Sequence, residues 1–295
     1  FQGWHDAMFA MRISILQNRG KQGSQLDGQR FAVCTRCAER VQIKEIKMRP
    51  DIVVISLESA RDRRENITRQ LDECGVEYSV FYGVDGRVSR SEVDAFYDEK
   101  LRKLLKGEAL TRGQIGCFAS HYKIWVNCFI SEKPVIVLED DARIHKDKFL
   151  QFINASDKIP ERFECIRLFF RSVRGNYEIK SGEVGGFDIV KYRKGLMSAV
   201  GYYLNPGGAH KLIKNVNPIF YPVDIYMERF WAHGAECYGV KPAFVEADSR
   251  FDTTIDYHNK KKDRSLFTRL RREAFNFSEK ARHTFHNGLF KLGLK

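Results

Sequence analysis

Short apolar runs separated by amphipathic stretches predict a β-α-β unit near residue 50. The run at 51–57 (DIVVISL) is short and rich in β-branched residues, which is typical of a buried parallel strand. Residues 59–74 carry apolar side chains at helical spacing, and Gly75 follows as a helix-ending cap. A second strand is expected at 77–82. The turn after the first strand would then face the carboxyl edge of the sheet, where open α/β folds bind ligands.

The same alternation continues to about residue 245. A charged helical region is expected at 89–106, and Thr111 with Gln114 forms a capping box for a long helix ending near residue 131. An apolar strand at 135–138 leads directly into three acidic residues. Further strands are expected at 165–170, 187–193, 198–204 and 237–245, and further helices at 206–214 and 223–233. This order of elements predicts an α/β domain with a mainly parallel central sheet.

The last part of the chain has a different pattern. From Ser265 onward, apolar residues recur every three or four positions with Arg and Lys between them. This pattern predicts a basic amphipathic helix or pair of helices. Such a helix either packs on the main domain or a partner, or binds an anionic membrane surface from one side. The expected division is an N-terminal leader or extension at 1–47, a catalytic domain at 48–258 and the helical tail at 259–295.

Composition narrows the class of protein. The net charge is +12, and the excess lies at the two ends of the chain around a near-neutral middle, which argues against a nucleic-acid-binding domain. No stretch is long and apolar enough to span a membrane, and no secretory signal is recognised, so a cytoplasmic location is expected. Seven cysteines with scattered spacing indicate a reducing compartment. We interpret the isolated C-x-x-C of Cys34 and Cys37 as incidental rather than as a zinc or redox site, and the residues FQG at 1–3 as the remnant of a cleaved tag.

The candidate chemistry centres on Glu139, Asp140 and Asp141, directly after a buried strand. Three adjacent carboxylates repel one another, so a divalent cation or basic side chains must offset their charge. Alternation along a strand puts Glu139 and Asp141 on one side, where both can reach one Mg²⁺ or Mn²⁺. The alternative is a solvated acidic loop that caps the next helix.

Basic residues follow the first strand of the β-α-β unit. Ser56 and Leu57 precede Arg61, which lies in the first helical turn and suits a phosphate or a uridine edge. Arg63 and Arg64 can equally be solvated faces of the helix.

Five segments together resemble glycosyltransferase family 25, the lipooligosaccharide sugar transferases related to collagen galactosyltransferases. Residues 110–125 (LTRGQIGCFASHYKIW) are the most specific match, although Gln114 stands where the family usually has Glu. The other segments are VISLESARDRR at 54–64, FYGVDG at 81–86, VLEDDA at 137–142 and YPVDIYM at 221–227. The resemblance covers about residues 51–256.

The resemblance implies a fold similar to the GT-A nucleotide-sugar transferases, a UDP-sugar donor and a metal ion, Mn²⁺ or Mg²⁺. Glu139 and Asp141 then look like metal-and-diphosphate residues, with His258 as the best-placed third ligand and His233 as the second choice. The residues that would line or support the donor pocket are Ser56, Leu57, Arg61, Tyr82, Gly83, Gly113, Ser120, His121 and Asp140. For His121 a hydrogen-bonded core position is the alternative, and Gly113 and Gly116 allow a close approach of either a ligand or a neighbouring segment.

Family 25 enzymes are classed as inverting, which implies a single displacement and one general base. Asp224 is the candidate base, with Glu228 as the alternative, and a helix N-cap is the competing explanation of Asp224. The expected reaction transfers galactose or glucose from a UDP-sugar to a lipooligosaccharide or lipopolysaccharide acceptor, at the cytoplasmic face of the inner membrane. A homodimer is compatible with this, and no nucleic-acid partner is expected. The competing functions are a non-enzymatic glycosyltransferase-like binding protein and a Mg²⁺-dependent phospho- or nucleotidyltransferase; no phosphate-cradling glycine-rich loop supports the latter.

Overall fold

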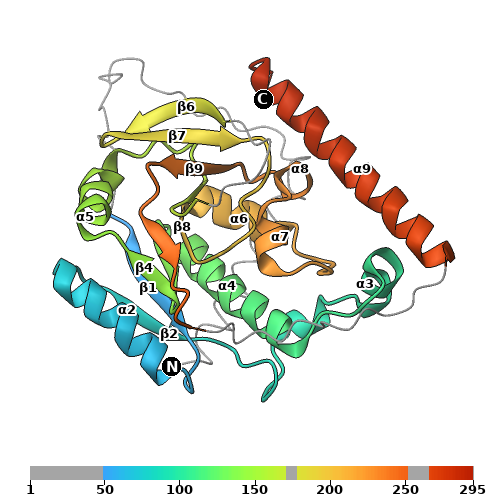
Figure 1. Ribbon diagram of the computed structural model, residues 1–295, viewed down its shortest axis with the longest axis horizontal. Coiled ribbons are helices and arrows are strands. Elements are labelled where there is room, and N and C mark those ends of the chain that lie inside the picture. Colours follow the sequence, from blue (N-terminus) through green and yellow to red (C-terminus); the bar gives the residue numbers. More distant parts are fainter. Residues whose placement is uncertain (1–48, 171–177, 252–265, 295) are drawn as a thin grey trace, which may run out of the picture. The chain divides into compact units, whose positions relative to one another are not determined.

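An eight-stranded sheet organises the part of the chain that the computed structural model describes, which comprises residues 49–170, 178–251 and 266–294 (Figure 1). All of these residues belong to one unit, 47–295. The strand order is β2-β1-β3-β8-β5-β9-β7-β6. The strands are β1 (Asp51–Ser56), β2 (Ser79–Tyr82), β3 (Val135–Glu139), β5 (Cys165–Arg167), β6 (Glu178–Val184), β7 (Phe187–Tyr192), β8 (Gly201–Leu204) and β9 (Cys237–Lys241).

The sheet is mixed. β1 pairs in parallel with both β2 and β3, and β5 pairs in parallel with β9. β8 runs antiparallel between β3 and β5, and β7 runs antiparallel between β9 and β6. The parallel part therefore coincides with the predicted β-α-β unit, while the later strands turn back more often than the sequence pattern indicated.

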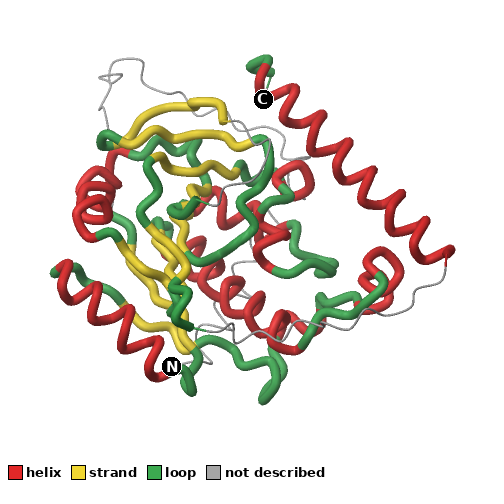
Figure 2. Tube along the Cα trace, in the orientation of Figure 1, coloured by secondary structure: helices red, strands yellow, loops and turns green. Residues whose placement is uncertain are grey.

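Helices cover both faces of the sheet (Figure 2). One face is covered by α2 (Arg61–Cys74) and α5 (Lys146–Ala155), and the other by α4 (Arg112–Ser131), α6 (Pro206–Lys214), α7 (Val223–Met227) and α8 (Phe230–His233). In β3, Ile136 and Leu138 join the first core while Val135 and Val137 join the second. This alternation is the reason that the strand is apolar throughout, since a strand buried on both faces has no solvent side.

The helix-boundary signals predicted from the sequence are confirmed. The Thr111 side chain accepts a hydrogen bond from the Gln114 backbone N–H, and the Gln114 side chain accepts one from the Thr111 backbone N–H. This pair is the expected capping box of α4. Gly75 ends α2 at a φ of +64°, in the left-handed region that glycine tolerates best. The predicted helix at 89–106 is a short 3₁₀ turn, η1 (Glu92–Ala95), followed by α3 (Glu99–Lys106). The predicted helix at 223–233 is two short helices, because the backbone leaves the helical conformation at Arg229.

Several elements had no prediction. After the acidic residues come β4 (Ala142–Ile144) and then α5 and the 3₁₀ turn η2 (Ser156–Lys158). β4 pairs with β10 (Val245–Ala247), about a hundred residues later in the chain. Strands of three residues carry too few positions to show a period, so long-range pairing alone defines them.

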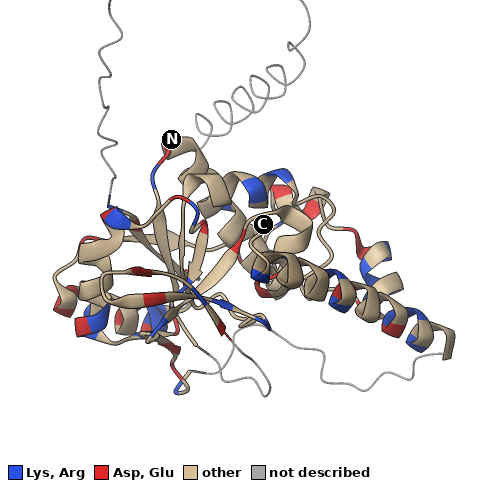
Figure 3. Cartoon of the chain, turned by 90° about the horizontal axis from the view of Figure 1, so that it is seen from above, with Lys and Arg blue, Asp and Glu red and all other residues tan. Residues whose placement is uncertain are grey.

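The C-terminal helix α9 (Leu266–Lys291) packs along α3 and α8. Arg229 donates to the Glu279 carboxylate at 2.6 and 3.1 Å, and His286 lies 2.9 Å from a Glu236 oxygen. Lys and Arg also recur along α9 (Figure 3). One face of the predicted amphipathic helix is therefore docked on the main domain. Among the described helices, none is both long and apolar enough to cross a bilayer.

Candidate functional site

A cavity of about 260 Å³ opens at the carboxyl ends of β1 and β3. These neighbouring parallel strands are in register through Ile55 and Glu139, so the residues that follow them lie side by side. The N-terminal half of α4 and the start of α7 also line the cavity. The site is thus at the sheet edge where the β-α-β unit predicted it.

The acidic residues do line this cavity, and Arg63 lies among them. One Arg63 nitrogen is 2.6 Å from Asp140 Oδ1 and 3.0 Å from Asp141 Oδ2. The Arg63 side chain is only 12% exposed, so its interpretation as a solvated helix face is wrong. The interpretation of the triplet as a solvated acidic loop is also wrong, because Asp140 is buried. Arg63 contributes one positive charge to a group of three carboxylates, which leaves room for a further cation.

The electrostatics of Asp141 reflect this imbalance. Burial, and after it the charge of Glu139, raise the pKa of Asp141 to about 7. Burial likewise raises the pKa of Asp140 above its ordinary value, although Arg63 opposes the effect. Asp141 Oδ1 is buried without a hydrogen-bond partner among the described residues. An unpartnered carboxylate oxygen beside Glu139 fits a hard divalent cation such as Mg²⁺ or Mn²⁺.

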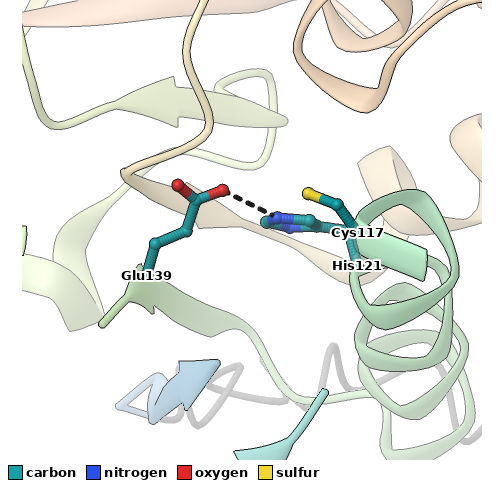
Figure 4. Close-up of side chains that lie close together, drawn as sticks. All are labelled: Cys117, His121 and Glu139. Carbon is teal, nitrogen blue, oxygen red and sulfur yellow. Dashed lines mark hydrogen bonds and ion pairs between the residues drawn. The ribbon is translucent and has the colours of Figure 1, made fainter. Parts of the chain in front are cut away.

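Glu139 is held by a chain of buried side chains. Its Oε1 lies 3.2 Å from His121 Nε2 (Figure 4). On the other side of the ring, His121 Nδ1 lies 2.8 Å from the Tyr202 hydroxyl. Trp125 Nε1–H donates to the same hydroxyl at 3.0 Å. One set of protons satisfies every group, with Tyr202 donating to Nδ1 and Nε2–H donating to Glu139. His121 is fully buried as a core histidine would be, yet it also contacts the acidic group directly.

Cys117 stands one helical turn before His121 on the cavity side of α4, and Figure 4 shows its sulfur next to the imidazole. Burial and the nearby carboxylates, Glu139 first, raise the pKa of the Cys117 thiol well above its ordinary value. Sequence reasoning did not single out this residue. Its spacing of four from His121 was visible, but spacing alone does not show which face of a buried helix meets a cavity.

Ser120 and two glycines fix the cavity wall formed by residues 83–86. The Ser120 hydroxyl accepts the Val84 N–H at 2.8 Å and donates to the Gly116 carbonyl at 2.8 Å. A Cβ on Gly116 would lie 2.4 Å from the Val84 carbonyl oxygen. A Cβ on Gly86 would lie 2.1 Å from the Arg112 carbonyl oxygen. The close approach expected at Gly116 is therefore to a neighbouring segment, whereas Gly113 lies on the cavity surface.

Asp224 also lines the cavity, from the start of α7. Burial raises its pKa, and its carboxylate accepts the Ile225 N–H at 2.8 Å. Pro222 holds the N-cap position of α7, so the N-cap explanation of Asp224 is wrong. Glu228, the alternative base, instead faces the fully buried Arg167 at 3.2 Å and lies outside the cavity lining.

The remaining predicted site residues divide into three groups. Ser56 and Leu57 line the cavity with His121 and Asp140, as expected. Arg61, Tyr82 and Gly83 do not line it. Arg61 pairs with Glu65 at 2.6 Å on the exposed face of α2, and Tyr82 is 58% exposed beneath the Arg64 guanidinium. His258 lies outside the described residues.

His233 is occupied elsewhere. Its Nε2 donates to the Tyr226 carbonyl at 3.1 Å and its Nδ1 accepts the Ala235 N–H at 3.1 Å. Burial lowers its pKa to about 3, and both ring nitrogens are used. It is therefore a core histidine and not the third metal ligand.

The segment before β8 supplies a part of the cavity that the sequence did not reveal. Met197, Ser198 and Ala199 line the cavity, and Met197 has a φ of +51°. A non-glycine residue in the left-handed region is strained and is often found at functional sites. Nothing in the residue type signals this conformation.

Fold and cavity together define an α/β protein with an acidic ligand site at the carboxyl edge of its sheet. The family model for glycosyltransferase family 25, described as an LPS biosynthesis protein, matches residues 49–227. The chain therefore belongs to glycosyltransferase family 25, which confirms the resemblance found in the motifs.

Relatives in this family differ in what their names say. Procollagen galactosyltransferase 2 of Homo sapiens is 30% identical over 189 residues, which are 60% of this chain and 29% of that protein. The lipooligosaccharide biosynthesis protein lic2B of Haemophilus influenzae is 32% identical over 126 residues, 39% of this chain and 46% of that protein. A Bos taurus relative, 27% identical over 218 residues (65% of this chain, 36% of that protein), is named a probable inactive glycosyltransferase 25 family member 3. The chain spans about a third of the length of the procollagen galactosyltransferases that it matches.

Proposed function

We propose that this chain is an inverting hexosyltransferase that moves galactose or glucose from a UDP-sugar to a lipooligosaccharide or lipopolysaccharide glycan. The observation that carries the proposal is the set of side chains that line the cavity, with Glu139, Asp140 and Asp141 after β3, Arg63 from α2 and Asp224 from α7. An excess of carboxylates suits a cation with a diphosphate, and a further carboxylate on a separate element suits a base. Family membership and the name of lic2B support transfer to such a glycan.

The donor's diphosphate would lie against the acidic group. Glu139 and Asp141 would hold Mn²⁺ or Mg²⁺, which when bound neutralises the departing diphosphate. Asp140 stays paired with Arg63, and the Ser56 and Leu57 edge of β1 receives the nucleoside. His121 orients the Glu139 carboxylate toward the cavity through its hydrogen bond.

Asp224 would act as the general base. Its carboxylate takes the proton of the acceptor hydroxyl as that oxygen forms a bond to the anomeric carbon. The bond from the anomeric carbon to the diphosphate oxygen breaks on the opposite face, and its electron pair leaves with UDP. Burial raises the pKa of Asp224, and a raised pKa makes the carboxylate a better proton acceptor.

The test combines donor binding with turnover. UDP release from a panel of UDP-sugars, with and without a lipooligosaccharide acceptor, identifies the donor, and thermal shift with UDP and Mn²⁺ measures binding. Asp224→Asn should keep metal-dependent stabilisation by UDP while acceptor-dependent release falls about 10²–10⁴-fold. Asp62→Asn, an exposed position on α2, is the control and should keep both.

Near-normal turnover in Asp224→Asn would remove the assigned base. UDP binding without any formation of UDP from UDP-sugars would favour the non-enzymatic binding protein. The name of the Bos taurus relative, a probable inactive family member, makes this the natural alternative. Transfer of phosphate or nucleotide rather than sugar would favour the other alternative.

We also propose that the outer face of α9 binds an anionic membrane at the cytoplasmic side. Leu270, Phe277 and Phe285 are each about 70% exposed, and they recur at seven- or eight-residue intervals on the face turned away from Glu279 and His286. Arg269 and Lys280 lie along one side of this stripe. An apolar stripe with basic residues beside it complements anionic headgroups, and a membrane position would bring the enzyme to a lipid-linked acceptor.

A further inference from the structure

Three potential metal ligands meet on one wall of the cavity. Cys117 Sγ, a His121 ring nitrogen and a Glu139 oxygen all lie within 4.8 Å of one another (Figure 4). The proposed transfer reaction gives Cys117 no role. The cluster also differs in chemistry from the Glu139 and Asp141 pair, because it adds a sulfur and a nitrogen to one carboxylate.

Rigid elements bring these side chains together. Cys117 and His121 are four residues apart on α4, so both project from the same face one turn apart. Phe118 and Trp125, which lie next to His121 around the helix and are fully buried in the core, fix its position. Glu139 ends β3, whose position is set by pairing with β1 on one side and β8 on the other. Small rotations of side chains, without movement of the backbone, would bring the three ligand atoms to one cation.

We propose that Cys117, His121 and Glu139 form a binding site for a thiophilic divalent cation, of which Zn²⁺ is the best match. Thiolate, imidazole and carboxylate are the ligand types that Zn²⁺ takes in proteins, whereas Mg²⁺ and Mn²⁺ prefer oxygen. Thiolate and carboxylate together balance the charge of the cation. Three protein ligands leave the fourth position open toward the cavity, as in zinc sites that keep an exchangeable ligand.

The hydrogen-bond chain behind His121 accommodates the cation. In the free protein Nε2–H donates to Glu139 and Nδ1 accepts from Tyr202. Metal binding needs the Nε2 lone pair, so the proton moves to Nδ1. Nδ1–H then donates to the Tyr202 oxygen, 2.8 Å away, and the Tyr202 O–H gives up its own donation to Nδ1 and rotates away. The Cys117 thiol proton goes to solvent. Binding therefore releases one proton per cation and leaves the imidazole neutral, with a partner behind it that fixes its orientation.

The site shares Glu139 with the acidic group. A cation held by Cys117 and His121 therefore draws Glu139 away from Asp141, and the two kinds of cation exclude each other. Under the proposed function, Zn²⁺ at this site inhibits the donor's metal-dependent binding. That consequence rests on the proposed function, whereas the binding site itself does not.

Binding is tested on the full chain carrying Cys34→Ser and Cys37→Ser, which removes the C-x-x-C thiols from competition. Co²⁺ serves as the spectroscopic probe because a thiolate ligand gives it a near-ultraviolet charge-transfer band. The band is expected in this parent, should vanish in Cys117→Ser and should persist in Cys74→Ser, a half-buried thiol on α2. Zn²⁺ affinity by competition with a chelating dye should fall about 100-fold or more in Cys117→Ser, since even outer-shell changes cost about 10–100-fold.

A Co²⁺ band that is absent in the parent, or that survives in Cys117→Ser, overturns the proposal. Proton release in weakly buffered solution should be one per Zn²⁺ in the parent and none in Cys117→Ser. Unchanged thermal unfolding of the metal-free Cys117→Ser protein shows that the variant is folded.

The two proposals fail separately. Thiol-dependent Zn²⁺ binding without any UDP stabilisation by Mn²⁺ removes the proposed function and keeps the site. UDP stabilisation by Mn²⁺ without thiol-dependent Zn²⁺ binding does the reverse. If both kinds of binding are observed, Zn²⁺ should abolish the Mn²⁺-dependent stabilisation by UDP in the parent. In Cys117→Ser, Zn²⁺ should no longer abolish it.

Discussion

Replacing Asp141 by Asn should stabilise the metal-free protein and at the same time remove its ability to bind UDP with Mn²⁺. The carboxyl of Asp141 has a pKa raised to about 7 by burial and by Glu139. In the unfolded chain the same carboxyl has a pKa of about 3.9. Asn keeps the shape of the side chain and can still pair with Arg63, but it carries no charge to bury.

The size and pH dependence of the effect follow from these two values. Below about pH 4 the carboxyl is protonated in both states and costs the folded protein nothing. As the pH rises toward 7 the unfolded chain ionises first and binds fewer protons than the folded chain. The free energy of the unfolded state therefore falls relative to that of the folded state. The wild type therefore loses stability over that interval, by roughly 1–2 kcal/mol at pH 5 and roughly 4 kcal/mol above pH 7. Asp141→Asn avoids the loss and should be more stable by those amounts.

The assay is chemical unfolding in EDTA at pH 5 and pH 8, followed by thermal shift with UDP and Mn²⁺ at pH 8. Asp62→Asn, exposed on the same side of the sheet in α2, should change neither quantity. An Asp141→Asn protein that is less stable than the wild type at pH 8, or whose advantage does not grow with pH, refutes the electrostatic reasoning. One that still gains stability from UDP and Mn²⁺ refutes the role of Asp141 as a metal ligand.

Two further predictions concern the cavity wall and the C-terminal helix. Gly116→Ala would place a Cβ 2.4 Å from the Val84 carbonyl oxygen, so the free energy of unfolding should fall by about 1–3 kcal/mol. In the control Gly207→Ala the new Cβ meets nothing closer than 3.4 Å, so no fall is expected. Equal effects of the two substitutions would contradict the contact. In vesicle sedimentation the full chain should bind anionic but not neutral vesicles, more weakly as salt is raised. Phe277→Asp should weaken this binding several-fold, whereas Val88→Asp, a more exposed position far from α9 in the sequence, should not. Salt-independent binding to neutral vesicles would exclude the proposed membrane face.

The sequence predicts best what local signals determine. The apolar run of β3, the capping box of Thr111 and the glycine cap of α2 each depend on a few neighbouring residues, and all three are present. The position of the acidic residues at the carboxyl edge of the sheet follows from the same strand. By contrast, β4 and β10 depend on pairing between segments far apart in the chain, and three residues give no period from which to find them.

Side-chain direction is the part of the site that the sequence predicted least well. Arg61 lay closer to the first strand than Arg63 and was the expected cavity residue. Because α2 begins at Arg61 itself, a rotation of about 100° per residue turns Arg61 outward to Glu65 and brings Arg63 over Asp140. Shifting the helix start by two residues would put Arg61 in the place of Arg63, and helix boundaries are uncertain by one or two residues.

The helix α4 explains why a motif as long as that at 110–125 holds structural and chemical residues in close alternation. Helical periodicity turns Gly116 and Ser120 to the 83–86 segment, where one allows contact and the other holds the Val84 N–H. The same periodicity turns Cys117 and His121 to the cavity and to Glu139.

Phe118 and Trp125, next to His121 around the helix, anchor it in the core. A substitution in any one of these three sets therefore moves the other two, because all are carried by one rigid element. The cavity's electrostatics and the stability of its wall are for this reason coupled. Measurements on cavity variants should accordingly be made on both metal binding and unfolding, since a loss of binding alone does not separate a lost ligand from a displaced helix.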